Sequence, residues 1–185
     1  MVSTNNLKNG MTVKIDGDLW RVDYFQHVKP GKGGAFVRTT LKGVQNGKTI
    51  DRTFRAGEEL EQAILEKRSL QYLYREGESY VFMDTEHFEQ TMVPPLALRD
   101  GARWIKEGDT IDLVFHAGEV VDINLPASVE LEITETEPGL QGDRVSGATK
   151  PATLETGATV QVPLFINVGQ RIKVDTRSGE YLSRA

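Results

Sequence analysis

Short stretches of alternating apolar and polar residues, separated by glycine turns, recur along all 185 residues of the chain. This pattern is typical of half-buried β-strands joined by tight turns. Seven stretches show it clearly, at residues 12–15, 79–83, 110–115, 120–123, 129–133, 159–162 and 171–174. The sequence therefore predicts an all-β protein.

Helical signals are few and short. Residues 57–65 begin with a cluster of glutamates, which favours the N-terminus of a helix, and residues 85–90 have room for one or two turns. Neither stretch is long enough to organise a core. We therefore expect at most short helices at these two places.

A weak internal repeat bears on the domain organisation. A glycine turn, a strand, a second glycine turn and a returning strand occur three times, beginning at Gly10, Gly108 and Gly157. The repeat favours three small β-barrels, although any β-meander places glycine turns at this spacing. Boundaries near Leu65 and Pro126 give domains over residues 1–64, 65–127 and 128–185, each close to the lower size limit of domains that fold alone.

The net charge is -5 at pH 7, but it is unevenly distributed. Residues 1–64 carry ten Lys and Arg against seven Asp and Glu, whereas residues 65–127 carry six against twelve. The net charge argues against a uniformly basic nucleic-acid-binding surface, and its uneven distribution favours a molecule that orients its N-terminal third toward a phosphate-rich partner.

Residues with catalytic or metal-binding chemistry form no recognisable site. The chain has no cysteine, its three histidines (His27, His87 and His116) lack ligand spacing, and no nucleophile motif is present. We expect no enzyme activity, catalytic residue, cofactor or metal. No signal peptide or membrane span is apparent, so a soluble cytoplasmic protein is expected, and strand edges spread over small barrels favour a monomer.

One lysine occupies the apex of a glycine-rich loop. Lys29, Pro30, Gly31, Lys32, Gly33 and Gly34 lie between two strand-like stretches, residues 20–25 and 35–41, which predicts a hairpin with Lys32 at its tip. Glycine on both sides of Lys32 permits positive φ angles, and Pro30 stiffens the loop.

A basic arm continues from this loop. No carboxylate occurs between Asp23 and Asp51, whereas the same interval and the residues just after it carry Lys29, Lys32, Arg38, Lys42, Lys48, Arg52 and Arg55. An exposed ammonium in a glycine loop lacks the apolar pocket that a Schiff-base lysine needs. It suits electrostatic contact with phosphate or modification by another enzyme.

A second polar loop, residues 142–153, contains Arg144, Thr149 and Lys150. Loops of this kind on small β-barrels are common RNA contacts, although an ordinary connector has the same composition. We take these three residues as candidate RNA-binding residues.

Longer motifs resemble those of a known family. They are residues 29–36, residues 85–90 (Thr-Glu-His-Phe-Glu-Gln), residues 129–140 with their final Glu-Pro-Gly-Leu, residues 150–157, residues 162–165 and residues 172–181. In this order, they resemble the bacterial elongation factor P family along essentially the whole chain.

The resemblance implies a fold and a mode of action. The expected fold has an N-terminal SH3-like or KOW-like barrel and two OB barrels, in an L-shaped outline like that of tRNA. The family binds the 70S ribosome beside the P-site peptidyl-tRNA and stimulates peptide-bond formation at consecutive prolines. Lys32 would approach the CCA end in a loop shaped by Lys29, Pro30, Gly31, Gly33 and Gly34.

The remaining candidate residues acquire roles from the same resemblance. Arg38, Lys42, Lys48 and Arg52 would lie along the tRNA acceptor stem or ribosomal RNA, while the loop at residues 142–153 would face the small subunit. Some family members carry an extension on the tip residue, so a Lys32-modifying enzyme stays open as a partner. A lysine tip disfavours rhamnosylation, which relatives carry on arginine, and the flexible glycine loop favours activity without modification.

Two other classes of function stay open at this point. A general KOW and OB protein that binds RNA in ribosome assembly or transcription would carry a larger basic surface, which the net charge of -5 disfavours. An amine-dependent enzyme centred on Lys32 would need catalytic partners near the tip, and the loop supplies only glycine, proline and a second lysine.

Overall fold

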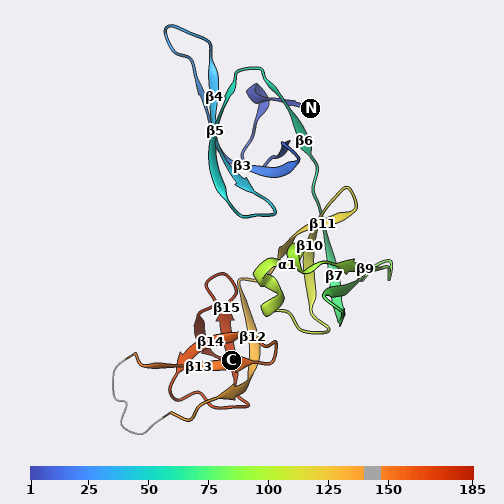
Figure 1. The fold of residues 1–185 in the computed structure, drawn as a ribbon, viewed down its shortest axis with the longest axis vertical. Helices are drawn as coiled ribbons and strands as arrows, with labels where there is room; N and C mark the ends of the chain where they lie inside the picture. Colours follow the sequence, from blue (N-terminus) through green and yellow to red (C-terminus); the bar gives the residue numbers. More distant parts are fainter. Residues whose placement is uncertain (140–146) are drawn as a thin grey trace. The chain divides into compact units, whose positions relative to one another are not determined.

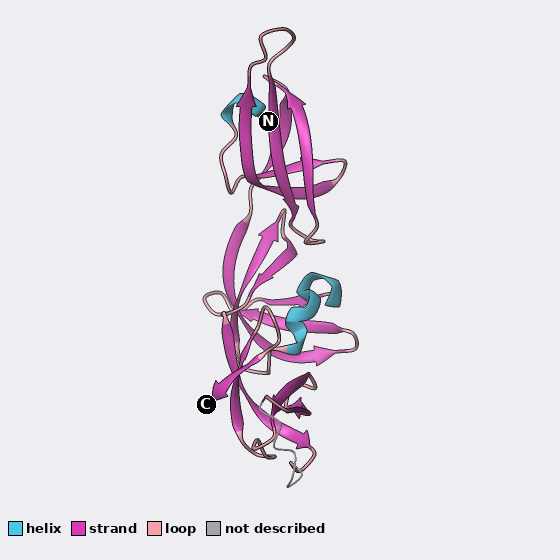
Figure 2. Cartoon of the chain, turned by 90° about the vertical axis from the view of Figure 1, so that its left-hand side faces the viewer, coloured by secondary structure: helices cyan, strands magenta, loops and turns pink. Residues whose placement is uncertain are grey.

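The structure, a computed structural model, describes residues 1–139 and 147–185. Strands dominate, and they form one six-stranded and two five-stranded sheets (Figures 1 and 2). The all-β prediction is confirmed, and each of the seven predicted stretches lies within a strand. The chain divides into two compact units, one of residues 1–68 and 113–122 and the other of residues 69–112 and 123–185.

The first sheet has the strand order β1-β6-β2-β3-β4-β5. Its strands are β1 (Val2–Ser3), β2 (Thr12–Ile15), β3 (Asp18–Val28), β4 (Phe36–Gly43), β5 (Thr49–Arg55) and β6 (Glu59–Ala63), with a 3₁₀ turn η1 (Thr4–Asn6) after β1. Val13, Val22, Val37 and Leu41 are fully buried in its core. Because buried residues alternate with exposed ones along much of these strands, the sheet has one apolar face, which forms the core.

The helix expected at residues 57–65 is wrong, because this stretch forms the strand β6. Leu60 and Ala63, both buried, are three residues apart, which is the spacing of one helix face and not that of one strand face. In the fold, however, β6 pairs antiparallel with β1 through Leu60 and Val2, and with β2 through Ala63 and Thr12. Those pairings satisfy the backbone of residues 59–63 in a sheet, which overrides the local helical preference.

The second sheet has the order β11-β10-β7-β8-β9, with β7 (Glu66–Glu76), β8 (Ser79–Asp84), β9 (Gln90–Val93), β10 (Thr110–His116) and β11 (Glu119–Asn124). The one or two helical turns expected at residues 85–90 are wrong, because residues 85–87 form a turn and Gln90 begins β9. The Asp84 carboxylate holds this turn by accepting the amides of Glu86 and His87 at 2.7 and 3.0 Å. The short helices α1 (Pro95–Leu98) and η2 (Arg99–Arg103) were not expected from the sequence. Pro95 at the first helical position is the signal that marks their start.

The third sheet has the order β14-β13-β12-β15-β16. Its strands are β12 (Ser128–Thr136), β13 (Thr149–Leu154), β14 (Thr159–Pro163), β15 (Arg171–Asp175) and β16 (Tyr181–Arg184). Trp104, which follows η2, is almost completely buried in the core of this sheet with Leu131, Ile133 and Ile172. Its burial ties the segment after η2 to the C-terminal barrel.

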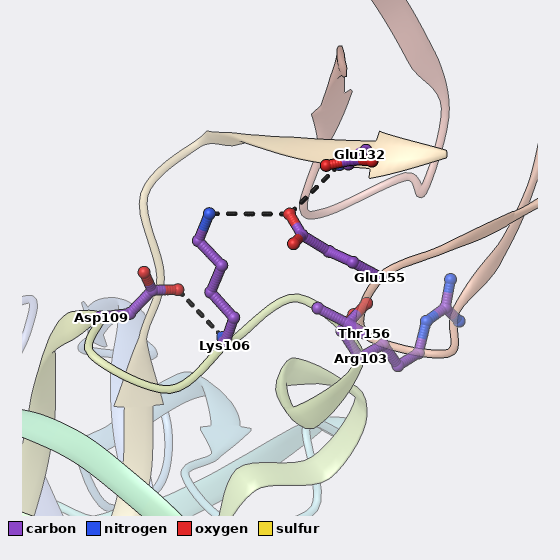
Figure 3. A network of polar contacts seen from close by, with 6 residues as sticks. All are labelled: Arg103, Lys106, Asp109, Glu132, Glu155 and Thr156. Carbon is purple, nitrogen blue, oxygen red and sulfur yellow. Dashed lines mark hydrogen bonds and ion pairs between the residues drawn. The ribbon is translucent and has the colours of Figure 1, made fainter. Parts of the chain in front are cut away.

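Polar contacts reinforce this tie within the second unit (Figure 3). The Glu155 carboxylate lies 3.6 Å from the Lys106 ammonium and accepts the Glu132 amide at 3.1 Å. The Thr156 hydroxyl donates to the Arg103 carbonyl. One carboxylate and one hydroxyl at the turn after β13 therefore bind the end of η2, the segment that follows it and strand β12.

The domain limits near residues 65 and 127 stay a prediction. Among the described residues, no three His, Asp or Glu side chains are grouped as a metal site would require. In the same part of the chain, no helix has the length and apolar character needed to cross a bilayer.

Candidate nucleic-acid interface

The glycine-rich loop connects β3 to β4, as the sequence predicts. The two strands pair up to Val28 and Phe36, and β5 supports β4 to the same level through Arg55. Residues 29–35 alone therefore project beyond the three-stranded support (Figure 1). The amide of Ala56 donates to the carbonyl of Ala35 at 3.1 Å and fixes the returning end of the loop.

The backbone uses glycine at one side of Lys32 only. Gly33 has φ of +110°, a conformation that other residues rarely adopt. Gly31 and Gly34 do not have positive φ angles, and a Cβ atom at either would meet open space. Glycine permits a positive φ at both positions beside Lys32, and the backbone adopts one at Gly33 and not at Gly31.

Lys32 is exposed, as are Lys29, Pro30, Gly31, Gly33 and Gly34. Its ammonium makes no hydrogen bond or ion pair with any residue that the structure describes. A lysine without an internal partner keeps three donors available for an external acceptor such as a phosphate or a carbonyl oxygen.

Arg38 and Arg52 line one hollow on the sheet. The cavity has a volume of about 370 Å³ and is lined by Tyr24, Gln26, Arg38, Thr39, Thr40, Asp51, Arg52 and Thr53. Each guanidinium lies over an aromatic ring, Arg38 over Phe36 and Arg52 over Phe54, both 5.4 Å from the ring centroid. Two cations with hydroxyl and amide neighbours form the kind of surface that contacts a sugar-phosphate backbone.

Two carboxylates near this cavity reduce its positive charge. Asp51 accepts the Thr40 hydroxyl at 2.9 Å, and Asp16 lies 3.7 Å from the Arg52 guanidinium. The Arg52 side chain is 44% exposed and that of Asp16 88% exposed, so this ion pair is worth little in water and exchanges readily for a phosphate.

Lys42 and Lys48 lie at the other end of β4. Lys42 pairs with Arg21 on β3 and Thr49 on β5, at the strand end opposite the tip loop, and Lys48 precedes β5 in the intervening turn. Both are exposed. The cations predicted to contact RNA therefore extend along the whole length of β4 instead of gathering at the tip.

The polar loop predicted at residues 142–153 is wrong over residues 149–153, which belong to strand β13 and pair with β14. Lys150 is only 5% exposed, and its ammonium donates to the backbone carbonyl of Glu137, so its charge is not free for RNA. Thr149 is exposed and its hydroxyl donates to the Gln161 side chain at 3.2 Å. Arg144 lies outside the described residues.

Tyr24 was missed as a site residue because its aromatic character was attributed to strand formation. It is 54% exposed and lines the same hollow as the two arginines. The irregular pairing of β3 between Val22 and Tyr24 turns this side chain outward. An exposed aromatic beside cations is a surface on which an unpaired base stacks.

Family models match the chain in three consecutive segments. Their descriptions are "Elongation factor P (EF-P) KOW-like domain" for residues 3–60, "Elongation factor P (EF-P) OB domain" for residues 65–123 and "Elongation factor P, C-terminal" for residues 129–184. Together these segments span most of the chain.

Full-length relatives give the same description. "Elongation factor P" of Acidothermus cellulolyticus is 58% identical over 185 residues, with 100% of this chain and 99% of that protein covered. "Elongation factor P" of Microcystis aeruginosa is 55% identical over 184 residues, with both chains fully covered.

Solved structures of lower identity share the fold. "Eukaryotic translation initiation factor 5A from Methanococcus jannaschii" superimposes with a TM-score of 0.54 at 24% identity, covering 66% of this chain and 92% of that one. At this identity the likeness concerns the arrangement of the strands alone.

Proposed function

The chain belongs to the elongation factor P family and is a translation elongation factor, and from this premise we propose that it relieves ribosomes stalled at consecutive prolines. It binds the 70S ribosome in the cytoplasm beside the P-site peptidyl-tRNA. The observation that carries the proposal is the exposed Lys32, whose ammonium has no partner among the described residues and which lies on a loop that projects beyond a braced hairpin.

The proposed action is positioning without proton transfer. Proline is a hindered secondary amine with a fixed φ, so two successive prolines hold the reacting groups in poor alignment. Holding the CCA end of the tRNA in place lowers the entropic part of that barrier. The Lys32 ammonium, delivered by residues 29–34, would contact oxygen atoms at that end.

Arg38 and Arg52 would contact the phosphates of the acceptor stem, and Lys42 and Lys48 would extend these contacts along β4. Such contacts fix position and orientation without reading base sequence. This suits a factor that must act on any prolyl complex. In this proposal Thr149 contributes from the start of β13, whereas the buried Lys150 supports the same strand from inside.

The test is a reporter that contains a Pro-Pro-Pro run, translated in a purified system. Added wild-type protein should raise the yield of full-length reporter, and Lys32→Ala should not. Lys173→Ala, which removes an exposed lysine on β15 outside the proposed contacts, serves as the matched control and should retain the rescue.

The same assay addresses modification of Lys32. Protein from the native cell and protein from a host without the modifying enzyme should rescue equally if the glycine loop acts unmodified. If neither preparation rescues, the proposal is wrong and a general RNA-binding role takes its place.

A further inference from the structure

A cavity of about 430 Å³ lies at the base of the tip loop, lined by Asn5, His27, Val28, Lys29, Ala35, Phe36 and Ala56. Its volume lies within the range of about 300–1,000 Å³ that is usual for sites of small molecules. None of these seven residues has a role in the proposed contacts with the acceptor stem except Lys29, which shapes the loop.

Three chain segments build the cavity, and backbone hydrogen bonds hold them together. The hairpin closes through the Val28 and Phe36 pair, and the amide of Ala56 donates to the carbonyl of Ala35 at 3.1 Å. Thr4 fixes η1 to the turn after β5. Its amide donates to the backbone carbonyl of Glu58 and its hydroxyl donates to the backbone carbonyl of Arg55, both at 2.8 Å. Asn5 is thereby held beside that turn.

The apolar part of the lining suits a flat aromatic ring. Phe36 and His27 contribute rings, while Val28, Ala35 and Ala56 are small and leave space. Each ring is already oriented by a neighbour: the Arg38 guanidinium lies 5.4 Å from the Phe36 centroid, and His27 packs edge to face with Phe25 at 5.6 Å. Oriented rings give stacking contacts at low entropic cost.

The polar part of the lining suits a phosphorylated base. The Asn5 carboxamide and the Lys29 ammonium make no hydrogen bond or ion pair with the described residues, and the lining contains no carboxylate. A carboxamide offers one donor group and one acceptor, which match the N6 and N7 edge of adenine. An ammonium at the rim suits a phosphate.

We propose that this cavity binds an adenosine monophosphate unit, with the base against Phe36 and Asn5 and the phosphate near Lys29. The unit is either a free nucleotide or one unpaired nucleotide of an RNA strand. The cavity and its lining carry this inference independently of the action on stalled ribosomes. The ligand can therefore be tested on the isolated protein.

The experiment follows amide shifts of the full-length ¹⁵N-labelled protein during titration with AMP, ribose 5-phosphate and the single-stranded trinucleotide AAA. AMP should produce saturable shifts at residues 5, 27–29, 35–36 and 56, with an affinity about tenfold or more above that of ribose 5-phosphate, because the base adds a stacking contact. Tighter binding of the trinucleotide than of AMP assigns the site to RNA, and equal binding assigns it to the free nucleotide.

Variants separate the base contacts from the charge contact. Phe36→Leu and Asn5→Ala should each weaken AMP about tenfold, while Lys29→Ala should weaken AMP but leave adenosine unchanged. Phe88→Leu makes the same chemical change at a phenylalanine that is 69% exposed outside the lining, and it should bind like the wild type. Because Asn5 is exposed, Asn5→Ala tests the site even if Phe36→Leu perturbs the strand.

Two results would overturn the proposal. If ribose 5-phosphate produces the same shifts with the same affinity as AMP, the loop attracts phosphate and the cavity holds no base. If AMP binds Asn5→Ala and Phe36→Leu as tightly as the wild type, it binds elsewhere. Since no ribosome is present in the titration, neither result tests the proposed action at consecutive prolines. Failure of the Pro-Pro-Pro reporter assay likewise does not test the nucleotide site.

Discussion

Gly33 is the residue of the tip loop whose backbone depends on the lack of a side chain. Its φ of +110° is strained for any L-residue with a Cβ, whereas Gly31 has no positive φ and faces open space. The two glycines flank the same lysine. Replacing each in turn therefore distinguishes the effect of backbone conformation from the effect of side-chain bulk.

We expect Gly33→Ala to reduce the fraction of loops that present Lys32 correctly. A penalty of about 1–2 kcal/mol for the left-handed conformation corresponds to roughly a 5- to 30-fold loss. The measurement is the factor concentration that gives half-maximal rescue of the Pro-Pro-Pro reporter. Gly31→Ala should remain within about twofold of the wild type by the same measure, and equal losses in both variants would contradict this account of the loop.

Lys150 shows what the sequence cannot predict at the residue scale. A lysine in a polar loop next to Thr149 has the pattern of an exposed cation. Its burial depends on the position of the Glu137 carbonyl, which strand pairing brings close from 13 residues away. By contrast, Lys32 was predictable because glycine and proline restrict a loop through local geometry alone.

At the scale of elements, strands with clear alternation were predictable and the choice between strand and helix was not. The β3-β4 hairpin follows from its own residues, because alternation and turn chemistry are local. Residues 59–63 form a strand through partners in β1 and β2, which lie more than 40 residues away in sequence. The local sequence pattern of residues 59–63 does not predict this pairing.

The turn between β15 and β16 gives a pH-dependent prediction. The Asp175 carboxylate accepts the amides of Ser178 and Arg177 at 2.9 and 2.8 Å, and these hydrogen bonds lower the pKa of that carboxyl group. A folded pKa below the unfolded value of about 3.9 means that the stabilisation is complete above that value and is lost as the pH falls below it.

Asp175→Asn should therefore lower the free energy of unfolding at pH 7, and the difference from the wild type should shrink below about pH 4. Urea unfolding at pH 7, 5 and 3 measures this. Glu180→Gln removes a nearby carboxylate without removing those two hydrogen bonds, so it is the control. A difference between Asp175→Asn and the wild type that stays constant from pH 7 to pH 3 would refute the turn's role.

At the scale of the whole molecule, the basic residues proposed to bind RNA and the acidic residues lie in different parts of the chain. The N-terminal sheet carries Lys32, Arg38 and Arg52, whereas residues 65–127 carry twice as many acidic as basic side chains. Composition alone predicted this asymmetry. The burial of Trp104 in the C-terminal core and the bond from Thr156 to the Arg103 carbonyl were not predictable, because they join positions far apart in sequence.

In the proposed function, Lys32 acts after the factor has bound, at the reacting end of the tRNA. The most direct measurement is the single-turnover rate of Pro-Pro bond formation on purified stalled ribosomes with saturating factor, together with ribosome occupancy by co-sedimentation. The wild type should accelerate formation of the bond, whereas Lys32→Ala should bind the ribosome but leave the rate at its factor-free value. Equal acceleration by bound Lys32→Ala and by the wild type would rule out this role of Lys32.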